Sequence, residues 1–292
     1  MVNIKLLKQL DTVLETRQRT LIMGVINLSL DSFSKDGTQE LDIINRKCES
    51  FIKHEVDIID IGAQSSRPLL TATYESQTFG EKWGGNPNKI NSQKEIDILL
   101  PVLDSINKNF DVLVSVDTYR SDVAYASFLN GASIINDISG LNADPKLAEI
   151  IADYKGKLII MHNQDNNDYK NMISEIKQSL IRSTEIAIKS GIKKKNIILD
   201  PGFGFGKNIE QNLCLLNNLD SFLELDYPLL VGTSRKSFIG AVINAPINRR
   251  VEGTAATVSI SITKGADMVR VHDVEQISKI VKMTDAVIRR SH

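Results

Sequence analysis

The sequence predicts an α/β protein of the (β/α)8 TIM barrel class, built as a single domain with long loops after strands 1 and 2. Eight short apolar runs recur at fairly even intervals, and helical patterns separate them. The chain of 292 residues also has the length of such a barrel. We therefore expect one domain over residues 1–292, with its core over about 20–290. A doubly wound open sheet is the weaker alternative, and length alone leaves two domains open.

The apolar runs are rich in Val, Ile and Leu, which is typical of strands buried on both faces of a parallel sheet. In chain order they are LIMGVIN (21–27), VDIIDIG (56–62), VLVSVD (112–117), SIINDI (133–138), KLIIMH (157–162), NIILD (196–200), PLLVG (228–232) and DMVRV (267–271).

Between the runs, apolar residues at spacings of three and four predict amphipathic helices. One clear stripe comprises Ile44, Cys48 and Phe51. Two further stripes comprise Tyr169, Met172, Ile176 and Leu180, and Val274, Ile277, Val281, Thr284 and Ile288. Strand therefore alternates with helix along the chain, which favours the barrel over the open sheet.

Two connections are unusually polar and rich in Gly and Ser, namely residues 28–40 and the extended loop 63–92. Both follow predicted strands, and loops at the carboxyl ends of barrel strands carry the lids and binding groups of such folds. For residues 70–90, a plain surface insertion is a fair alternative, because the loop is far longer than a usual connection.

Composition excludes several classes of partner. Lys and Arg together number 35 and Asp and Glu 36, so the formal net charge of -1 indicates neither a nucleic-acid nor a membrane partner. The first 20 residues show no signal or transit pattern, and no run approaches the roughly 18 apolar residues that span a bilayer. Cys48 and Cys214 are interpreted as packed free thiols, which suits a reducing compartment. We expect a soluble, cytoplasmic protein.

Polar residues gather at the ends of the predicted strands. They are Asn27, Gln64 to Arg67, Asp117, Asn136, His162, Asp200, Ser234 to Lys236, Arg270 and His272. Because a barrel interior is apolar and its strands are parallel, these residues converge on one mouth. This convergence is the main indication of an enzyme.

Four of these residues suit the edge of a nitrogen heterocycle. Asp117 and Asp200 would accept hydrogen bonds from paired N–H donors, beside Asn136 and Lys236. Each aspartate also has a structural interpretation, because Asp frequently caps a helix or initiates a turn.

The segments GTSRKS (232–237) and RVH (270–272) favour a phosphate or pyrophosphate site, which these barrels commonly place after strands seven and eight. The alternatives are a structural role for His272 and an ordinary ion pair for Arg235. For His162, the structural interpretation is the stronger one. No His and Cys cluster indicates zinc, whereas Mg²⁺ needs few protein ligands, with Asn27 as a candidate.

The stretch DPGFGFGK (200–207) combines an acid, three glycines, two phenylalanines and a lysine. Glycines let a ligand approach the backbone closely, while the neighbouring side chains offer charge and flat apolar surface. This mixture is typical of a site for a polar aromatic ligand.

Nine stretches in order resemble the dihydropteroate synthase family from about residue 20 to residue 290. They are MGVINLSLDSFS, DIIDIGAQSSRP, VSVDTYRSDVA, GASIINDISG, IIMHN, ILDPGFGFGK, LVGTSRKSFIG, EGTAAT and KGADMVRVHDV. The resemblance implies a transferase that joins 6-hydroxymethyl-7,8-dihydropterin pyrophosphate to p-aminobenzoate, giving 7,8-dihydropteroate and pyrophosphate, with Mg²⁺. It also implies a homodimer and a target of sulfonamides.

The resemblance assigns residues to each part of the site. Pterin binding falls to Asp117, Asn136, Met161, Asp200 and Lys236. The p-aminobenzoate slot would consist of Phe33, Ser66, Pro68, Phe205 and Ser237, with Lys236 nearby. Pyrophosphate would be held by Asn27, Arg67, Arg270 and His272, with Asn27 at the metal. A catalytic role is implied for Arg67, Lys236, Arg270 and His272, which would assist pyrophosphate to leave before the aromatic amine attacks.

The two mobile loops of the family differ in this chain. NLSLDSFSKDGT stands where the family reads N-x-T-P-D-S-F-S-D-G-G, so that Leu30 replaces proline and Lys35 replaces an acid, followed by Asp36. AQSSRPL stands for G-E-S-T-R-P-G, with Gln64 in place of the acid and Ser66 in place of threonine. These departures touch loop closure and sulfonamide response, and they leave the pterin pocket unchanged.

Two further functions stay open at this stage. The altered loops allow a catalytically weak pterin-binding paralogue. A pterin-dependent methyl transferase that acts with a corrinoid partner is the other alternative, although the SRK and RVHD segments favour a site for pyrophosphate, which such chemistry lacks.

Overall fold

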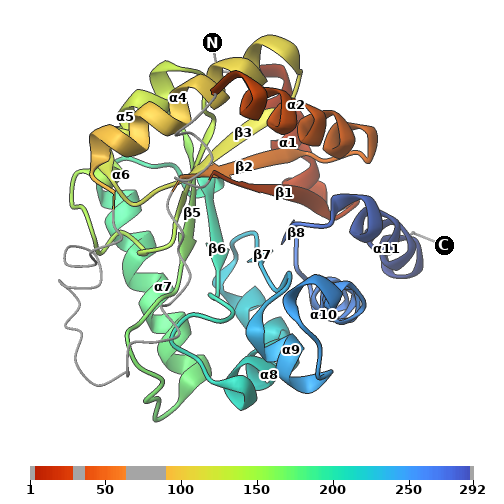
Figure 1. The fold of residues 1–292 in the computed structure, drawn as a ribbon. Coiled ribbons are helices and arrows are strands. Elements are labelled where there is room, and N and C mark those ends of the chain that lie inside the picture. Colours follow the sequence, from red (N-terminus) through yellow and green to blue (C-terminus); the bar gives the residue numbers. More distant parts are fainter. Residues whose placement is uncertain (1–3, 29–36, 64–89, 290–292) are drawn as a thin grey trace.

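Eight parallel strands and the helices between them form a barrel in the computed structural model of the protein (Figure 1). The structure describes residues 4–28, 37–63 and 90–289. The strands are β1 (Leu21–Asn27), β2 (Ile58–Gly62), β3 (Leu113–Asp117), β4 (Ile134–Asp137), β5 (Lys157–Met161), β6 (Ile197–Asp200), β7 (Leu230–Val231) and β8 (Met268–Val271). Each strand lies within one of the eight apolar runs, so the predicted order of strands is confirmed.

Helices surround the sheet, and α1 (Ile4–Thr16) precedes the first strand (Figure 1). The others are α2 (Gly37–Lys53), α4 (Ser92–Asn109), α5 (Ser121–Leu129), α6 (Leu147–Asp153), α7 (Met172–Lys189), α8 (Ile209–Asn217), α9 (Ser237–Val242), α10 (Val251–Thr263) and α11 (Val274–Ile288). Short 3₁₀ turns occur at η1 (Lys194–Asn196), η2 (Leu219–Leu225) and η3 (Ile247–Arg249). Among the described residues, no helix is both long enough and apolar enough to span a membrane.

The sheet runs in the order β6-β5-β4-β3-β2-β1-β8-β7, which is the order of a barrel cut open between β6 and β7. A parallel bridge between Leu199 and Leu229 joins these last two strands. In addition, the Leu199 N–H donates to the Pro228 carbonyl at 2.9 Å. The barrel therefore closes, and the (β/α)8 prediction is confirmed over the open sheet.

Helix α1 lies across the end of the barrel at which the strands begin. Its buried Leu10 and Leu14 pack with residues from all eight strands. These partners are Leu21, Met23, Ile58, Leu113, Ile134, Ile159, Ile198, Leu230 and Met268. Because this end is filled by apolar side chains, the polar strand ends lie together at the opposite end, which we call the mouth.

The predicted helical stripe on α2 faces the sheet, whereas the stripe on α11 is exposed at its last residue, Ile288. Ile44, Cys48 and Phe51 of α2 are all buried. Gly24 of β1 permits this packing, since a Cβ there would lie 2.5 Å from Phe51 Cδ2. Because Gly24 has no side chain, α2 can approach β1 closely.

Three details differ from the sequence expectations. The β7 ladder is short, since it pairs Leu230 and Val231 alone with β8. Tyr169 precedes α7, which begins at Met172 because the Asn171 side chain accepts the Ser174 N–H and caps it. Cys214 is exposed, so the prediction of a packed thiol is wrong for it, whereas Cys48 is buried and both cysteines are free.

The first predicted loop ends earlier than expected, and the second ends within one residue of its predicted bound. Helix α2 already begins at Gly37, inside the range 28–40. Helix α4 begins at Ser92, capped by the Asn91 side chain, which accepts the Lys94 N–H at 2.8 Å. Residues 64–89 of the extended loop lie outside the described residues.

Candidate active site

The mouth brings together polar residues from four strands. Asp117 and Asn136 are neighbours across β3 and β4, and Met161 and Asp200 are neighbours across β5 and β6. From β8, Arg270 Nη2 lies 2.9 Å from Asp117 Oδ2. The convergence that was predicted from the strand ends is thus present for these residues.

Asp60 of β2 is a further charged residue of the mouth, and sequence reasoning missed it. Its side chain is 0% exposed, and Arg270 binds it through Nη2 at 2.6 Å and through Nε at 2.7 Å. Asn136 Nδ2 also points to Asp60 Oδ2, at 3.4 Å. A single acid inside the apolar strand IIDIG was the available signal, because a buried carboxylate requires a partner.

Burial raises the pKa of both aspartic acids at the strand ends, Asp117 and Asp200. Desolvation raises the pKa of Asp117 to about 7, against the opposing charge of Arg270 and with a smaller contribution from the Asp60 carboxylate. Desolvation also raises the pKa of Asp200, opposed by the Gly202 N–H and by the charges of Lys236 and Arg270. The mouth therefore contains two carboxyl groups that titrate above their ordinary range.

The glycine-rich loop after β6 folds back under the mouth. The Gly202 N–H donates to Asp200 Oδ1 at 2.7 Å, so Asp200 both initiates the turn and faces the mouth. Lys207 is buried and donates to the Gly202 and Phe205 carbonyls at 2.9 and 3.0 Å. Its ammonium group also lies 3.1 Å from His162 Nδ1. Lys207 therefore stabilises the loop from within, and buried His162 has the structural contact that was the stronger interpretation.

An apolar wall lies beside these polar groups. Tyr119, Ile138, Met161 and Phe205 form a separate buried cluster. The Lys236 ammonium lies 4.1 Å from the centre of the Phe205 ring, a cation–π distance. Flat apolar surface, a cation and buried carboxylates thus adjoin one another, as a polar aromatic ligand requires.

The β7–β8 side of the mouth is rich in cations. Arg235 pairs with Asp273 through two contacts, Nε reaching Oδ2 at 2.9 Å, so the ion-pair alternative for Arg235 is correct. His272 bonds to Ser234 through both its backbone N–H and its ring Nδ1, each at 3.1 Å from the hydroxyl. Burial and the nearby charges of Arg270 and Arg235 lower the pKa of His272 to about 3. His272 is therefore neutral at physiological pH and acts as a hydrogen-bonding group, not as a cation.

Two predicted residues are exposed at the edges of the mouth. Asn27 ends β1 opposite Gly62 of β2, and Ser237 begins α9 directly after Lys236. Within the described part of the chain, no three or more His, Cys, Asp or Glu side chains gather as metal ligands. One exposed amide oxygen still suits Mg²⁺, which keeps several waters and commonly takes its other ligands from phosphate.

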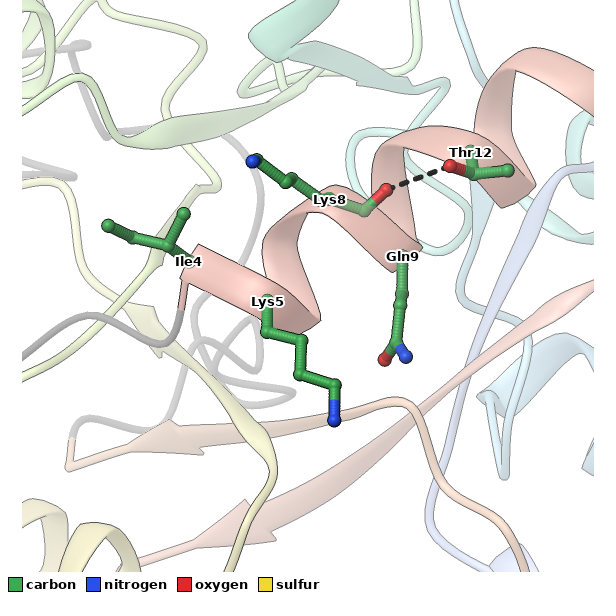
Figure 2. Close-up of a pocket in the computed structure, with 5 residues that line it drawn as sticks. All are labelled: Ile4, Lys5, Lys8, Gln9 and Thr12. Atoms are coloured by element: carbon green, nitrogen blue, oxygen red, sulfur yellow. Dashed lines mark hydrogen bonds between the residues drawn. The ribbon is translucent and has the colours of Figure 1, made fainter.

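A hollow of about 420 Å³ lies elsewhere, along one face of α1 (Figure 2). Its lining residues are Ile4, Lys5, Lys8, Gln9 and Thr12, all exposed. The Thr12 hydroxyl is already bonded to the Lys8 carbonyl at 3.0 Å. Because this helix lies at the end opposite the mouth, the hollow contributes nothing to the polar site.

Comparison with known proteins identifies the family. The family of pterin binding enzymes matches residues 80–272. A dihydropteroate synthase of Clostridium beijerinckii is 43% identical over 275 residues, which cover 94% of this chain and 96% of that protein. The chain belongs to the dihydropteroate synthase family. The dihydropteroate synthase of Bacillus subtilis is 40% identical, over 96% of this chain and 92% of its own length.

Solved structures of dihydropteroate synthases share the barrel. The enzyme from Clostridium difficile, determined in the presence of pteroic acid, has a TM-score of 0.84 and 39% identity, covering 93% of this chain and 98% of its own. The enzyme from Xanthomonas albilineans with 4-aminobenzoic acid has a TM-score of 0.81 and 30% identity, covering 92% and 93%. This chain is therefore an alkyl-transferring enzyme of the dihydropteroate synthase type.

Several residues that the dihydropteroate synthase resemblance assigns lie outside the described residues. They are Phe33, Ser66, Arg67 and Pro68, together with the departures at Leu30, Lys35 and Gln64. The described residues thus include the expected pterin groups and the Asn27, Arg270 and His272 part of the pyrophosphate group, whereas most of the p-aminobenzoate slot is not described.

Proposed function

We propose that the protein condenses 6-hydroxymethyl-7,8-dihydropterin pyrophosphate with p-aminobenzoate to give 7,8-dihydropteroate and pyrophosphate. The observation that carries this proposal is the set of half-buried Asp117 and buried Asn136 and Asp200 beside Arg270. Carboxylates and an amide of this kind match the donors and acceptors of a pterin edge. The apolar wall with Phe205 and Lys236 supplies the adjoining flat surface.

In this proposal the pterin lies among Asp117, Asn136, Met161, Asp200 and Lys236. The two carboxylates accept from its ring N–H groups and favour positive charge on the ring as the leaving group departs. Their burial makes this electrostatic effect stronger than it would be in water.

Pyrophosphate would be held by Asn27, Arg67, Arg270 and His272. The bond between the pterin methylene carbon and the pyrophosphate oxygen breaks, and its electron pair leaves with pyrophosphate. Mg²⁺, with Asn27 as a candidate ligand, would offset negative charge on the leaving group. Arg270 contributes a fixed positive charge, and His272 contributes hydrogen bonding.

The second substrate would enter beside Phe205, within a slot completed by Phe33, Ser66, Pro68 and Ser237. The amine nitrogen of p-aminobenzoate forms the new bond to the methylene carbon and then releases one proton. No nucleophile from the protein takes part. The catalytic roles therefore belong to groups that bind and stabilise charge, namely Arg67, Lys236, Arg270 and His272.

The proposal is tested by the release of pyrophosphate from purified protein with Mg²⁺ and dihydropterin pyrophosphate, with and without p-aminobenzoate. Dihydropteroate is measured in the same samples. Product that depends on the amine and equals the released pyrophosphate supports the synthase. Tight pterin binding without product would instead indicate a catalytically weak paralogue, and the absence of pyrophosphate release would favour another pterin-dependent transferase.

Replacing Lys236 should weaken the binding of both substrates. We expect Lys236→Ala to lower kcat/KM for each substrate by about 10- to 100-fold, because a hydrogen bond from a charged group is lost along with the contact to Phe205. Lys264→Ala is the matched control, since that lysine pairs with Asp220 at an exposed position on the outer helices. Full kcat/KM in Lys236→Ala would show that the role is wrong.

The affinity for the pterin should depend on pH through Asp117. Its pKa of about 7 means that the carboxyl is protonated at lower pH and no longer accepts from both pterin donors. We expect binding to weaken by about tenfold per pH unit below the pKa. The measurement is calorimetric titration with 6-hydroxymethyl-7,8-dihydropterin, which lacks the titrating pyrophosphate. Asp117→Asn should bind weakly with this pH dependence reduced, and a wild-type affinity that is constant from about pH 5 to 8 would contradict the role.

Three broader expectations belong to the same proposal. They are a single domain over residues 1–292, a cytoplasmic location and a homodimer. The homodimer is supported by exposed apolar residues on α10 and α11, namely Ile260, Met283, Val287 and Ile288. Light scattering should give twice the 32.5 kDa of the chain.

A further inference from the structure

Asp60 occupies a position that packing alone does not explain. It lies in the middle of β2, beside Val25 of β1 and Ser115 of β3 in the strand register, and its side chain is fully buried. Asp60 Oδ2 accepts from Arg270, whereas Oδ1 has no hydrogen-bond partner within the described residues. A carboxylate satisfied on one side only is a poor contributor to stability, because its desolvation opposes the gain from pairing.

The contacts of Arg270 are divided unequally between two carboxylates. Asp60 Oδ2 binds both Nε and Nη2, at 2.7 and 2.6 Å. Asp117 Oδ2 binds only Nη2, at 2.9 Å. The hydrogen bond from Nε and the ion-pair contact from Nη2 converge on one fixed oxygen of Asp60 and orient the guanidinium plane, whereas Asp117 receives a single hydrogen bond from Nη2.

The carboxylate of Asp117 has a second role, because the proposed function requires it to accept hydrogen bonds from the pterin. When Asp117 engages the substrate, Arg270 needs another anion to offset its permanent charge and to hold its orientation. Asp60 meets this need, since it lies deeper than Asp117 and its side chain has no exposed surface. Arg270 itself is 20% exposed, so its guanidinium is anchored from below and still reaches the mouth.

We infer that Asp60 is a positioning residue, which holds the Arg270 guanidinium in place while Asp117 binds the substrate. This inference rests on the proposed function. Asp60 is outside direct contact with substrate in this arrangement, and it acts only through Arg270.

The test compares Asp60→Asn with Asp267→Asn. Asp267 is also a buried acid with an arginine partner, 3.2 Å from Arg17, but it precedes β8 at the end opposite the mouth. Both variants are expected to lower thermal stability. Only Asp60→Asn should lower kcat, by about 100-fold, with little change in the KM for p-aminobenzoate, because the misplaced group acts on the leaving pyrophosphate. Unchanged kcat in Asp60→Asn would overturn the inference.

A double-variant cycle separates positioning from general damage. In an Arg270→Gln background, Asp60→Asn should change kcat by less than about threefold, because the group that Asp60 positions is already gone. An equal fold-loss of kcat from Asp60→Asn in the wild-type and Arg270→Gln backgrounds would overturn the inference. Asp60→Glu keeps the charge but shifts the carboxylate, so it should also lose kcat, and full activity in Asp60→Glu would contradict a role in position.

Failure of the proposed function would be visible separately, as a wild type that makes no dihydropteroate. In that case, calorimetric binding of dihydropterin pyrophosphate replaces kcat as the readout in the same cycle. If Asp60→Asn alone fails to fold, the double variant Asp60→Asn/Arg270→Gln is compared with Arg270→Gln. The double variant leaves no unpaired arginine. Equal binding by the double variant and by Arg270→Gln supports the inference, and weaker binding by the double variant contradicts it.

Discussion

Arg270→Ala is expected to reduce kcat/KM by about 10²- to 10³-fold and to destabilise the protein by about 3–5 kcal/mol near pH 8. Two buried carboxylates, Asp60 and Asp117, would lose the cation that pairs with both. The same change removes a positive charge from the place where pyrophosphate is proposed to leave. Stability is measured by urea unfolding and activity by pyrophosphate release.

The stability loss in Arg270→Ala should depend on pH. Without the arginine, the folded-state pKa of Asp117, which burial already raises, moves further above the unfolded value of about 4. A carboxyl group whose folded pKa is raised gives its contribution below the unfolded pKa and loses it as pH rises through the folded pKa. The variant should therefore approach the wild type near pH 4 to 5 and fall below it progressively toward pH 8.

Arg289→Ala is the matched control for this prediction. Arg289 is mostly buried and pairs with Asp285 at 3.0 Å, and it also donates to the Ala266 carbonyl near the start of β8. We expect this control to lose stability and to retain kcat/KM. Equal loss of activity in both variants would show that Arg270 acts through stability alone, and a deficit in Arg270→Ala that is constant with pH would contradict the pairing of its partners.

Gly202→Ala is expected to destabilise the protein by about 2–4 kcal/mol and to lower pterin binding at the same time. Gly202 has φ of +75°, which disfavours a side chain, and an added Cβ would lie 1.9 Å from the His162 carbonyl oxygen. Because the obstacle is backbone, the loop after β6 must move. That movement would break the bond from the Gly202 N–H to Asp200 and displace Phe205.

Gly191→Ala isolates the cost of backbone conformation from the cost of the clash. Its φ is +98°, but the nearest atom to an added Cβ is Ala152 Cβ at an ordinary 3.6 Å. We expect Gly191→Ala to cost about 1–2 kcal/mol and to leave substrate binding unchanged. Calorimetry with the pterin and urea unfolding check both variants, and equal effects in the two would contradict the role assigned to the close approach at Gly202.

The sequence predicted the architecture well because its signals are local. A buried parallel strand requires a continuous run of Val, Ile and Leu, and eight such runs separated by helical stripes leave few alternatives to a barrel. The ends were less certain, since β7 covers two residues of its apolar run and the Asn171 cap, not apolar content, decides where α7 begins.

The sequence by itself determined that four polar residues meet at the mouth, although it did not reveal Asp60. Parallel strands carry their carboxyl ends to the same end of a barrel, so Asp117, Asn136, Asp200 and Arg270 had to meet once the strands were assigned. The family resemblance then followed from the order of the same stretches. Neither inference needed a distance.

Only the tertiary structure decided how these groups interact. Asp60 and Arg270 are 210 positions apart and pair because β2 and β8 flank β1 in the sheet. Lys207 bonds within its own loop, and His272 is neutral because burial and neighbouring cations disfavour its charged form. Pairing and desolvation depend on the distances between elements that are remote in the chain, and local sequence patterns contain no record of those distances.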